Sequence, residues 1–388
     1  MLVDVLGMTI MIPLLPFYAV HFGASATVVG LLMSTYAFCQ LIAGPFLGKW
    51  SDSMGKRKPL LIVSQLGTFV GFLILAFATN LWVVFLARII DGLTAGNLSL
   101  AQAHIADVTE PENRAKSFGL IGIAFGIGFV IGPAISGFLS QYDATYPIFA
   151  AAALSALSVI CTATLLVEPE HHAIAGDEAS GPAGKRLGVF DWSRYAEYFA
   201  RPGLGTLLWQ FFFFAFPFSL FFGGFALYAN QRYQWNGHAV GIHEISWVLL
   251  YVGMLGVILQ GGLIGRLVKR FGERALVRTG YLAGGIGYGL LAWTRTIPQL
   301  FGASTINSYG MGVLRPSLTA LISHKAGKRE QGVVLGLTQS ITSICSVIAP
   351  LIAGMLIDGK YLSTWALLTG GFAFAGLALS LTDRGDTA

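Results

Sequence analysis

Long apolar runs alternate with short polar connections along almost the whole chain. An α-helix rises about 1.5 Å per residue, so a run of about 20 apolar residues crosses a bilayer core of about 30 Å. The runs are continuous rather than short and alternating, which favours helices and excludes a β-barrel. We therefore predict twelve membrane-spanning helices, over residues 1–20, 26–47, 59–78, 81–104, 116–140, 145–167, 204–229, 240–265, 275–295, 298–323, 332–357 and 362–382.

The longest polar stretch, residues 168–203, separates the first six predicted helices from the last six. Its final part, WSRYAEYFARP, mixes aromatic and basic residues in the way that is typical of a short helix at a membrane interface. The predicted domains are a six-helix bundle over residues 1–167, a cytoplasmic linker over 168–203 and a second six-helix bundle over 204–388.

Composition supports a membrane protein. Hydrophobic residues make up 55% of the chain and charged residues 11%, against about 25% charged in a soluble domain. The net charge of +5 comes from basic residues in short loops and not from a basic domain, so we expect no nucleic-acid partner. Cys39, Cys161 and Cys345 stand singly within apolar runs, so neither a disulfide framework nor a metal site is predicted.

Basic residues are divided very unevenly between the two sides of the predicted bundle. Of the 24 lysines and arginines, Arg232, Arg295 and Lys360 fall on one side, Arg88 and Arg315 lie inside predicted helices, and the remaining nineteen share the other side. Cytoplasmic loops carry the excess of such residues in membrane proteins. The pattern predicts a multi-pass protein of the cytoplasmic (inner) membrane with both termini in the cytoplasm.

The two groups of helices repeat each other at a constant offset of 217 residues. Gly48 matches Gly265, and the segment VIGPAISGFL (130–139) is echoed by VIAPLIAGML (347–356). Repeats of the same topology are related by an axis along the membrane normal, and the rocking of one against the other opens a central cleft to each side in turn. The repeat therefore predicts a transporter that works by alternating access.

Four motifs, in this order, resemble the major facilitator superfamily, and within it the twelve-span drug:proton antiporters, particularly the tetracycline-resistance efflux pumps. They are DVLGMTIMIPLLP (4–16), GKWSDSMGKRK (48–58), RIIDGLTAG (88–96) and GIGFVIGPAISG (126–137). The resemblance implies two pseudo-symmetric six-helix halves, a small-molecule substrate and protons as partners within the lipid bilayer; we expect a monomer. The sequence has no phosphate-cradling G-x-x-x-x-G-K-[ST] loop, so we expect no cofactor and a proton gradient as the energy source.

Charged side chains within the predicted helices are the candidates for proton coupling: Asp4, Arg88, Asp91 and Arg315. A charge at bilayer depth costs at least about 2.5 kcal/mol, so each should face an aqueous cleft or a partner. On a helical wheel Arg88 and Asp91 share one sector with Ser99 and Gln102, which predicts a polar stripe. Three alternatives remain open: Arg88 and Asp91 only neutralise each other, Asp4 only caps its helix, and Arg315 extends toward the membrane surface.

The predicted substrate cleft combines polar and aromatic side chains: Ser99, Gln102, Phe211, Phe214 and Ser308. The segment WQFFFFAFPFSLFFGGF (209–225) carries phenylalanine on every helix face, so some rings must point inward. Aromatic walls suit a flat amphipathic or cationic substrate. A lipid-facing aromatic belt is the alternative.

The resemblance assigns two further groups, a cytoplasmic gate (Gly48, Asp52, Gly55 and Arg57) and an antiporter motif (Gly126, Gly132, Pro133 and Gly137). It implies that Asp52 meets a helix N-terminus of the other half when the cytoplasmic side closes, because that helix end carries partial positive charge. Gly48 and Gly55 would allow close approach and a tight turn. The alternatives are a solvated loop acid and ordinary transmembrane glycine packing.

These patterns predict proton-coupled efflux of small amphipathic molecules or drugs, and not an enzyme. HEISW (243–247) lacks the second histidine of a zinc protease. The alternatives are a proton-coupled importer or facilitator of a nutrient, and a membrane sensor that does not transport. The resemblance to the tetracycline-resistance pumps implies polar groups in two places where this chain has none: the helix over 275–295 has no acidic residue, and the membrane core of 244–265 has no histidine. These departures argue against tetracycline itself as the substrate.

Overall fold

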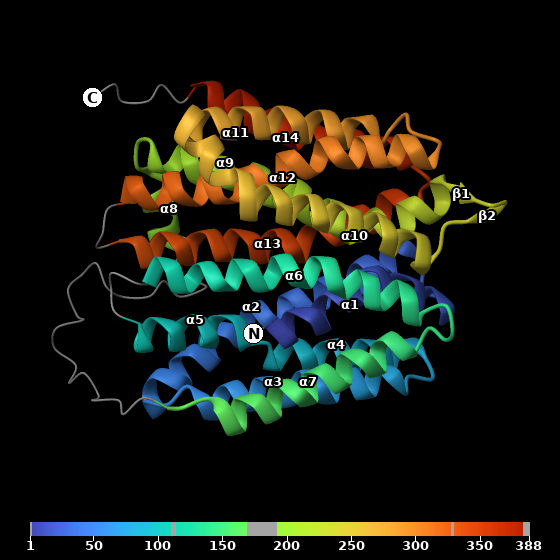
Figure 1. The fold of residues 1–388 in the computed structure, drawn as a ribbon, viewed down its shortest axis with the longest axis horizontal. Coiled ribbons are helices and arrows are strands. Elements are labelled where there is room, and N and C mark those ends of the chain that lie inside the picture. Colours follow the sequence, from blue (N-terminus) through green and yellow to red (C-terminus); the bar gives the residue numbers. More distant parts are fainter. Residues whose placement is uncertain (1, 110–113, 169–191, 327–329, 383–388) are drawn as a thin grey trace. The chain divides into compact units, whose positions relative to one another are not determined.

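The computed structural model describes residues 2–109, 114–168, 192–326 and 330–382, except for the side chains of Asp52, Ala106, residues 114–120 and 192–195, and Gly332. This part of the chain is almost entirely helical (Figure 1). The earlier helices are α1 (Leu2–His21), α2 (Ala26–Met54), α3 (Lys58–Ala76), α4 (Leu81–Thr94), α5 (Asn97–Val108), α6 (Arg114–Leu139) and α7 (Tyr146–Leu165). The later helices are α8 (Trp192–Ala200), α9 (Leu204–Arg232), α10 (Ile242–Ile258), α11 (Ile264–Leu290), α12 (Ile297–Ala326), α13 (Gln331–Asp358) and α14 (Leu362–Thr382).

Two further elements complete the described chain. A π-helical turn, Leu259–Leu263, joins α10 to α11. Strands β1 (Gln234–Trp235) and β2 (His238–Ala239) form a short antiparallel hairpin after α9. The short helix predicted at the end of the linker is present as α8.

Ten helical stretches of the described residues are long and apolar enough to cross a membrane. One of them, Ile242–Leu290, has 49 residues, which is enough for two crossings. The 30 residues of α12 supply a further crossing-length helix. The predicted all-α membrane fold is confirmed.

The chain divides into two compact units. The first comprises Met1–Gly176 with Val240–Gly253, and the second comprises Asp177–Ala239 with Met254–Ala388. The boundary therefore also cuts α10, whose first part belongs to the first unit. The predicted six-helix domains over residues 1–167 and 204–388, joined by a linker over 168–203, remain a prediction.

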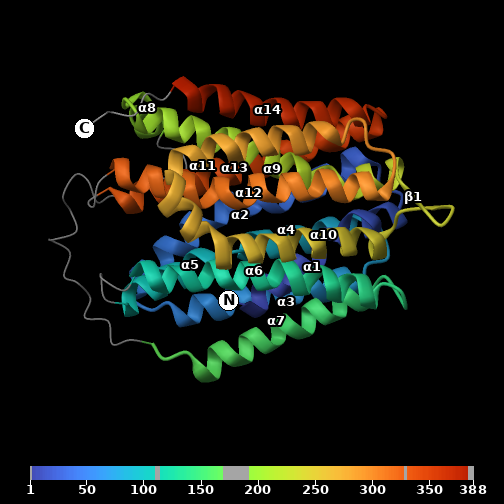
Figure 2. The same ribbon diagram turned by 45° about the horizontal axis from the view of Figure 1, so that its top comes forward.

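In the first unit, α1 packs on α6 and α7, and α3 packs on α4 and α7. Both views show α3 beside α7 (Figures 1 and 2). Glycine permits the close approaches, since a Cβ on Gly71 would lie 3.0 Å from Asp91 Cβ and one on Gly128 would lie 2.5 Å from Val5 Cγ1.

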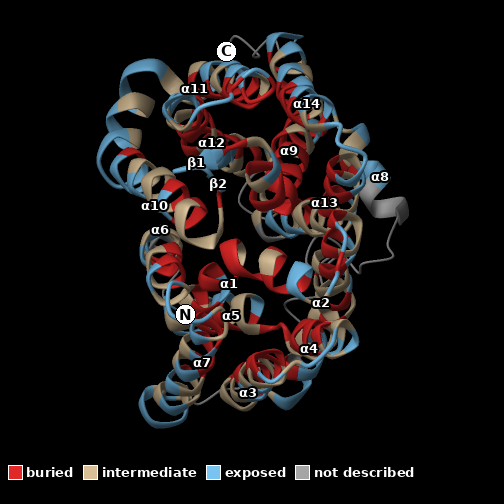
Figure 3. Ribbon diagram, turned by 90° about the vertical axis from the view of Figure 1, so that its right-hand side faces the viewer, coloured by how far each residue is buried: buried red, intermediate tan, exposed pale blue. Residues whose placement is uncertain are grey.

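The second unit uses the same pairs of elements 217 residues later. α9 packs on α13 and α14, and α11 packs on α12 and α14. Most of α9 is buried, and Trp365, Tyr228, Tyr281 and Tyr288 are among the largest fully buried side chains (Figure 3). The repeat in the sequence thus recurs as a repeat of helix contacts.

The span predicted over residues 81–104 is present as Leu81–Ile105, but its helix is interrupted between α4 and α5. Ser64 of α3 binds the backbone at the break. Its hydroxyl donates to the carbonyl of Thr94 and accepts the N–H of Gly96 at 2.8 Å. These two backbone groups are therefore satisfied outside the helix, and the chain can leave the helical path without unpaired polar groups.

The loops predicted after residues 47 and 265 are wrong. α2 continues through Gly48 to Met54. α11 begins at Ile264 and is helical up to a kink at Gly272, within the basic segment GRLVKRFGER (265–274). The second segment, GRLVKRFGER, is rich in residues with good helix propensity, so a helix can extend there beyond the apolar run. The first, GKWSDSM (48–54), is not, and local propensity does not explain its helix. The direction changes only at Gly55 and Gly272, which have φ of 61° and 76° and thus adopt the left-handed conformation that favours glycine.

Candidate functional site

A buried ion pair lies on α4. Arg88 Nη1 is 3.1 Å from Asp91 Oδ2, and the two residues are 5% and 4% exposed. The spacing of three residues places both on one helix face. The Arg88 guanidinium also lies 5.8 Å from the ring centroids of Tyr36 and Phe72. Attraction to the carboxylate and to the aromatic faces offsets the loss of water around this charge.

The guanidinium of Arg88 is only partly satisfied. Its Nε and Nη2 atoms are buried and have no hydrogen-bond partner among the described residues. A proton on Asp91 would weaken the one carboxylate contact of a charge that cannot reach water. Such an arrangement makes the protonation state of Asp91 matter for the packing around α4.

A chain of polar contacts joins α1, α3 and α7 near Asp4. Gln65 Nε2 donates to Ser158 Oγ at 2.9 Å and lies 3.4 Å from Asp4 Oδ2. Gln65 and Ser158 are buried, and Asp4 is half-buried at the start of α1. Sequence reasoning missed Gln65 and Ser158. The signal was Gln65 itself, an amide within the apolar run LLIVSQLGTFVG (60–71).

The polar stripe predicted along residues 88–102 is wrong as one continuous face. Ser99 and Gln102 lie on α5, beyond the break, and both are exposed, whereas Arg88 and Asp91 are buried. The helical wheel assumed an unbroken helix, whereas the helix is interrupted between Thr94 and Asn97. Contact of Ser99 and Gln102 with substrate remains a prediction.

The candidate residues of the second unit lie in two different environments. Phe211 and Phe214 are buried in α9 with their ring centroids 5.6 Å apart, and Ser308 is buried in α12. Arg315, further along α12, is exposed and precedes Pro316. The roles of these four residues in binding substrate remain predictions.

Arg57 is the centre of a cluster of ion-pair and hydrogen-bond contacts at the start of α3. Its Nε lies 2.9 Å from Asp107 Oδ2, and its Nη1 donates to Ser51 Oγ at 2.9 Å. Glu168 accepts the backbone N–H groups of Arg57 and Lys58 at 2.6 and 2.9 Å, so its carboxylate caps the positive end of α3. Sequence reasoning missed Asp107 and Glu168, which are far from Arg57 in the chain.

The other gate residues flank this cluster. Gly48 lies inside α2, and Gly55 makes the turn into α3. The side chain of Asp52 lies outside the described residues. Its predicted contact with the other half therefore stays a prediction.

The antiporter motif packs α6 tightly against two neighbours. A Cβ on Gly132 would overlap the side chain of Thr9 in α1. A Cβ on Gly137 would lie 2.6 Å from Ser246 Cβ in α10. Pro133 is buried between these two glycines, and Gly126 is half-buried earlier in the same helix. The two close glycines give α6 its contact distance to α1 and to the first part of α10.

A histidine lies where α6 ends against α10. His243 Nε2 accepts the indole N–H of Trp247 at 3.1 Å, and its Nδ1 lies 3.0 Å from the carbonyl oxygen of Gly137. The Nε2 atom of Gln141 lies 3.1 Å from the same Nδ1, so His243 links the end of α6 to α10 through both side-chain and backbone contacts.

A second cluster of charged residues connects α8 to the start of α13. Arg201 Nη1 lies 2.7 Å from Glu330 Oε2 and Nη2 lies 2.9 Å from Glu197 Oε1. The hydrogen bond to Glu197 raises the pKa of Arg201, and burial raises the pKa of Tyr198, over whose ring Arg201 lies at 4.2 Å. Glu330 is the N-cap residue of α13, so this cluster lies at that helix end.

Among the residues that the structure describes, no group of three His, Cys, Asp or Glu side chains could hold a metal ion. The polar chemistry described above consists of ion pairs and hydrogen bonds. It can bind and release protons and can hold helices in defined positions.

Comparison with known proteins gives consistent matches over nearly the whole chain. The profile of the Major Facilitator Superfamily matches residues 1–350 and 237–387. A class E tetracycline resistance protein of Escherichia coli is 32% identical, over 93% of this chain and 87% of its own. The quinolone resistance protein NorA of Staphylococcus aureus (strain COL) is 28% identical, over 98% of this chain and 93% of its own.

Solved structures show the same fold. The human organic anion transporter MFSD10 (TETRAN) matches with a TM-score of 0.72 at 21% identity, over 98% of this chain and 96% of that one. The nucleoside transporter NupG matches with a TM-score of 0.72 at 16% identity, over 97% of this chain and 96% of that one.

Proposed function

Because this chain belongs to the Major Facilitator Superfamily of membrane transporters, we propose that it exports small amphipathic molecules across the cell membrane in exchange for protons. The family resemblance predicted from the four motifs is confirmed, and this family and fold are those of transporters and not of enzymes. The relatives named for resistance to tetracyclines, quinolones and multiple drugs support export of drug-like molecules.

The buried pair of Arg88 and Asp91 is the observation that carries the proposal. In the proposed cycle, Asp91 takes a proton from the outer side, the attraction to Arg88 weakens, and α4 shifts relative to α3. Release of the proton to the cytoplasm restores the pair. The two conformations would differ in the contact between Arg88 and Asp91. A proton that neutralises Asp91 therefore shifts the equilibrium between them, and a proton gradient can drive the cycle.

Asp4 and Gln65 extend this polar region to α1. Gln65 contacts both Asp4 and Ser158, so a change in the charge of Asp4 would be felt in α3 and α7. We assign Asp4 as the second proton-carrying candidate, next to Asp91. Arg315 on α12 would act as an anion or carbonyl anchor for substrate, with Ser308 deeper in the same helix.

The Arg57 cluster supports a gate on the cytoplasmic side. The Arg57 side chain contacts Asp107 and Ser51, and its backbone N–H donates to the Glu168 carboxylate. These contacts hold the turn after α2 in one conformation. In the proposed gate, the carboxylate of Asp52 would approach the N-terminal end of α13 when the halves close. Both termini lie in the cytoplasm in this orientation, and the protein works as a monomer without a cofactor.

Transport in proteoliposomes with an imposed pH gradient tests the proposal. We expect vesicles with an acidic interior to take up members of a panel of fluorescent cationic dyes, quinolones and tetracycline. A protonophore should collapse that uptake. Uptake that needs an acidic exterior would instead indicate a proton-coupled importer, and flux independent of the gradient would indicate a facilitator.

A binding measurement on the same panel separates transport from a sensor role. A sensor would bind a molecule of the panel without any flux, whereas an exporter should bind and move the same molecule. Empty liposomes and liposomes with a heat-denatured sample serve as controls for passive dye entry.

A further inference from the structure

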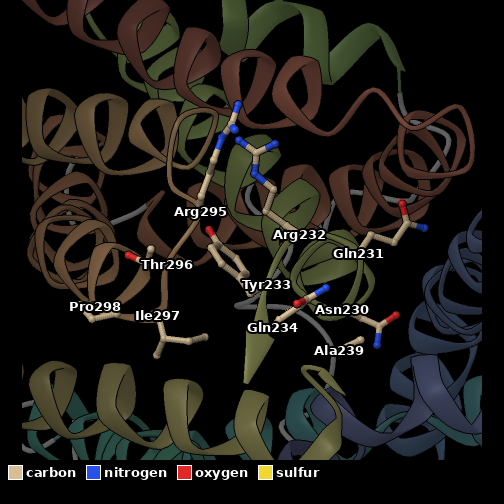
Figure 4. A pocket seen from close by; sticks show the side chains of 10 residues that line it. All are labelled: Asn230, Gln231, Arg232, Tyr233, Gln234, Ala239, Arg295, Thr296, Ile297 and Pro298. Atoms are coloured by element: carbon tan, nitrogen blue, oxygen red, sulfur yellow. The ribbon is translucent and has the colours of Figure 1, made fainter. Parts of the chain in front are cut away.

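Two of the three basic residues predicted for the outer side meet in one place. Arg232 ends α9, and Arg295 lies in the connection between α11 and α12. Both line a cavity of about 580 Å³, together with Tyr233, Gln234 and Thr296. Both side chains extend toward the same side in the view of Figure 4, and both also line a second, neighbouring cavity.

Arg232 is held rigidly by backbone oxygens. Its Nε donates to the carbonyl of Thr294 at 2.9 Å, and its Nη2 donates to the carbonyl of Ala292 at 2.7 Å. Tyr233 stabilises the same turn, with its hydroxyl 2.6 Å from Thr294 Oγ1. A guanidinium has five N–H donors, so Arg232 retains donors for a ligand while its orientation is already determined.

The charge of this site is not compensated within the described residues. None of the ion pairs among them includes Arg232 or Arg295. Neighbouring like charges repel, and the repulsion is larger where the surroundings are partly buried, as at Arg232. An anion between the two guanidinium groups would remove the repulsion and accept charge-assisted hydrogen bonds from both.

The shape of the surroundings indicates which anion. A second cavity, of about 260 Å³, shares both arginines and adds Ser363, Trp293 and Leu367. Trp293, in the connection between α11 and α12, is 67% exposed. Leu367, on the apolar helix α14, is 46% exposed. Tryptophan is enriched at the membrane–water interface, and an exposed leucine on a spanning helix is suited to lipid tails. A small soluble anion would not need this apolar edge.

We propose that Arg232 and Arg295 bind the headgroup phosphate of an anionic phospholipid, with an acyl chain along Trp293 and Leu367. Basic pockets between transmembrane helices are typical sites for such headgroups. The orientation proposed above places this lipid in the outer leaflet. Binding itself does not depend on transport, so the two proposals can fail separately.

Native mass spectrometry of the full-length protein in detergent tests the site. Phosphatidylglycerol and phosphatidylcholine are titrated separately at low ionic strength. We expect phosphatidylglycerol to bind about tenfold more tightly than phosphatidylcholine, because the net charge of the lipid reinforces each phosphate contact. Equal binding of the two lipids would overturn the proposal.

Two variants locate the binding. Arg295→Gln removes an exposed guanidinium. It leaves the hydrogen bond from the backbone N–H of residue 295 to Gln299 Oε1. Lys360→Gln is the matched control, since it removes the third outer cation, which is exposed and lines neither cavity. We expect about a tenfold loss of phosphatidylglycerol affinity for Arg295→Gln only. Equal losses in both variants, or no loss in either, would contradict the assignment.

Competition with sodium phosphate separates the lipid from a soluble anion. Sodium chloride at equal ionic strength is the control for screening. We expect the two salts to displace phosphatidylglycerol equally. Selective displacement by phosphate, lost in Arg295→Gln, would show that free phosphate is the ligand and would overturn the lipid assignment.

Discussion

The pairs α3–α4 and α11–α12 are copies of one helix pair, yet they bury different chemistry. At the offset of 217 residues, Arg88 and Asp91 correspond to Thr305 and Ser308. The first pair holds a buried ion pair, whereas in the second Ser308 is buried and Thr305 is exposed. The helix contact is found in both units, since Gly67 packs against the Thr94 side chain in one and Gly284 packs against the Met311 side chain in the other. Helix packing was therefore kept while charge was retained in only one copy.

The basic turns after α2 and within α11 differ in the same way. Arg57 corresponds to Arg274 at this offset. Arg57 is 7% exposed and bound to Asp107, whereas Arg274 is exposed. The first turn is thus a rigid cluster, and the second has the ordinary role of a basic loop that orients a membrane protein.

The largest effect is expected at the ion pair. Asp91→Asn should reduce proton-driven uptake to background and leave substrate exchange, because the titrating group is lost. It should also lower the free energy of unfolding by about 3–5 kcal/mol, since Arg88 is left as an unpaired buried charge. Transport in proteoliposomes and thermal unfolding in detergent measure the two effects.

A double variant and the equivalent residue serve as controls for that prediction. Arg88→Gln with Asp91→Asn should recover stability but not driven uptake. Recovery of driven uptake would show that the pair is purely structural. Ser308→Ala, at the position equivalent to Asp91, should leave uptake dependent on the proton gradient. If this variant lost that dependence, proton coupling would not be confined to the first unit.

The next effect is expected at the turn around Arg57. Arg57→Gln should lower the free energy of unfolding by about 2–3 kcal/mol, because it removes a charged hydrogen bond to Asp107 and another to Ser51. Arg274→Gln should change it by less than about 0.5 kcal/mol, as expected for an exposed residue. Thermal unfolding of both variants checks this, and equal shifts would mean that the two turns do not differ.

A smaller effect is expected where α6 meets α1. Gly132→Ala should lower the free energy of unfolding by about 1–3 kcal/mol, because the new methyl overlaps Thr9. The corresponding positions of the second unit, Ala349 and Ala226, are both alanine. Thr9→Ala combined with Gly132→Ala should therefore restore stability in thermal unfolding.

Gly122→Ala is the matched control in the same helix. A Cβ at Gly122 meets nothing within 4 Å, so this variant should be neutral or slightly stabilising. A loss as large as that of Gly132→Ala would show that helix flexibility matters here and not contact with α1.

The smallest effect is expected at the turns that precede α7 and α14, where Asp143 corresponds to Lys360. Asp143 accepts bonds from the hydroxyl and the N–H of Thr145, both at 2.7 Å, and they lower the pKa of this carboxyl. A lowered pKa stabilises the fold above the ordinary value of about 3.9 and loses that effect as pH falls through the folded value.

Thr145→Ala removes the hydroxyl donor to Asp143. The difference in unfolding temperature from wild type should be small near neutral pH and should vanish in acid. For Lys360→Gln, the difference in unfolding temperature from wild type should be the same near neutral pH and in acid. A difference for Thr145→Ala that persists in acid would place its cause outside the Asp143 carboxylate.

Much of this molecule follows from the sequence alone because its determinants are local. The length and hydropathy of each run specify a spanning helix, and a glycine with positive φ makes the turn at Gly55. The offset of 217 residues between the halves is visible in the letters, and the helix pairs repeat accordingly. Arg88 and Asp91 could be paired from their spacing, since residues three apart share a helix face.

Tertiary structure decided what depends on distant partners. No local pattern shows that Ser64 binds the backbone between α4 and α5. Nor does one show that Asp107 and Glu168 contact Arg57, or that Gln65 contacts Asp4 and Ser158. Helical periodicity assigns a face to each residue but not the neighbour that covers it. Those contacts arise when buried polar groups must find partners after the helices pack. The interruption after α4 and the partners of Arg57 and Gln65 are therefore determined only by the packed helices.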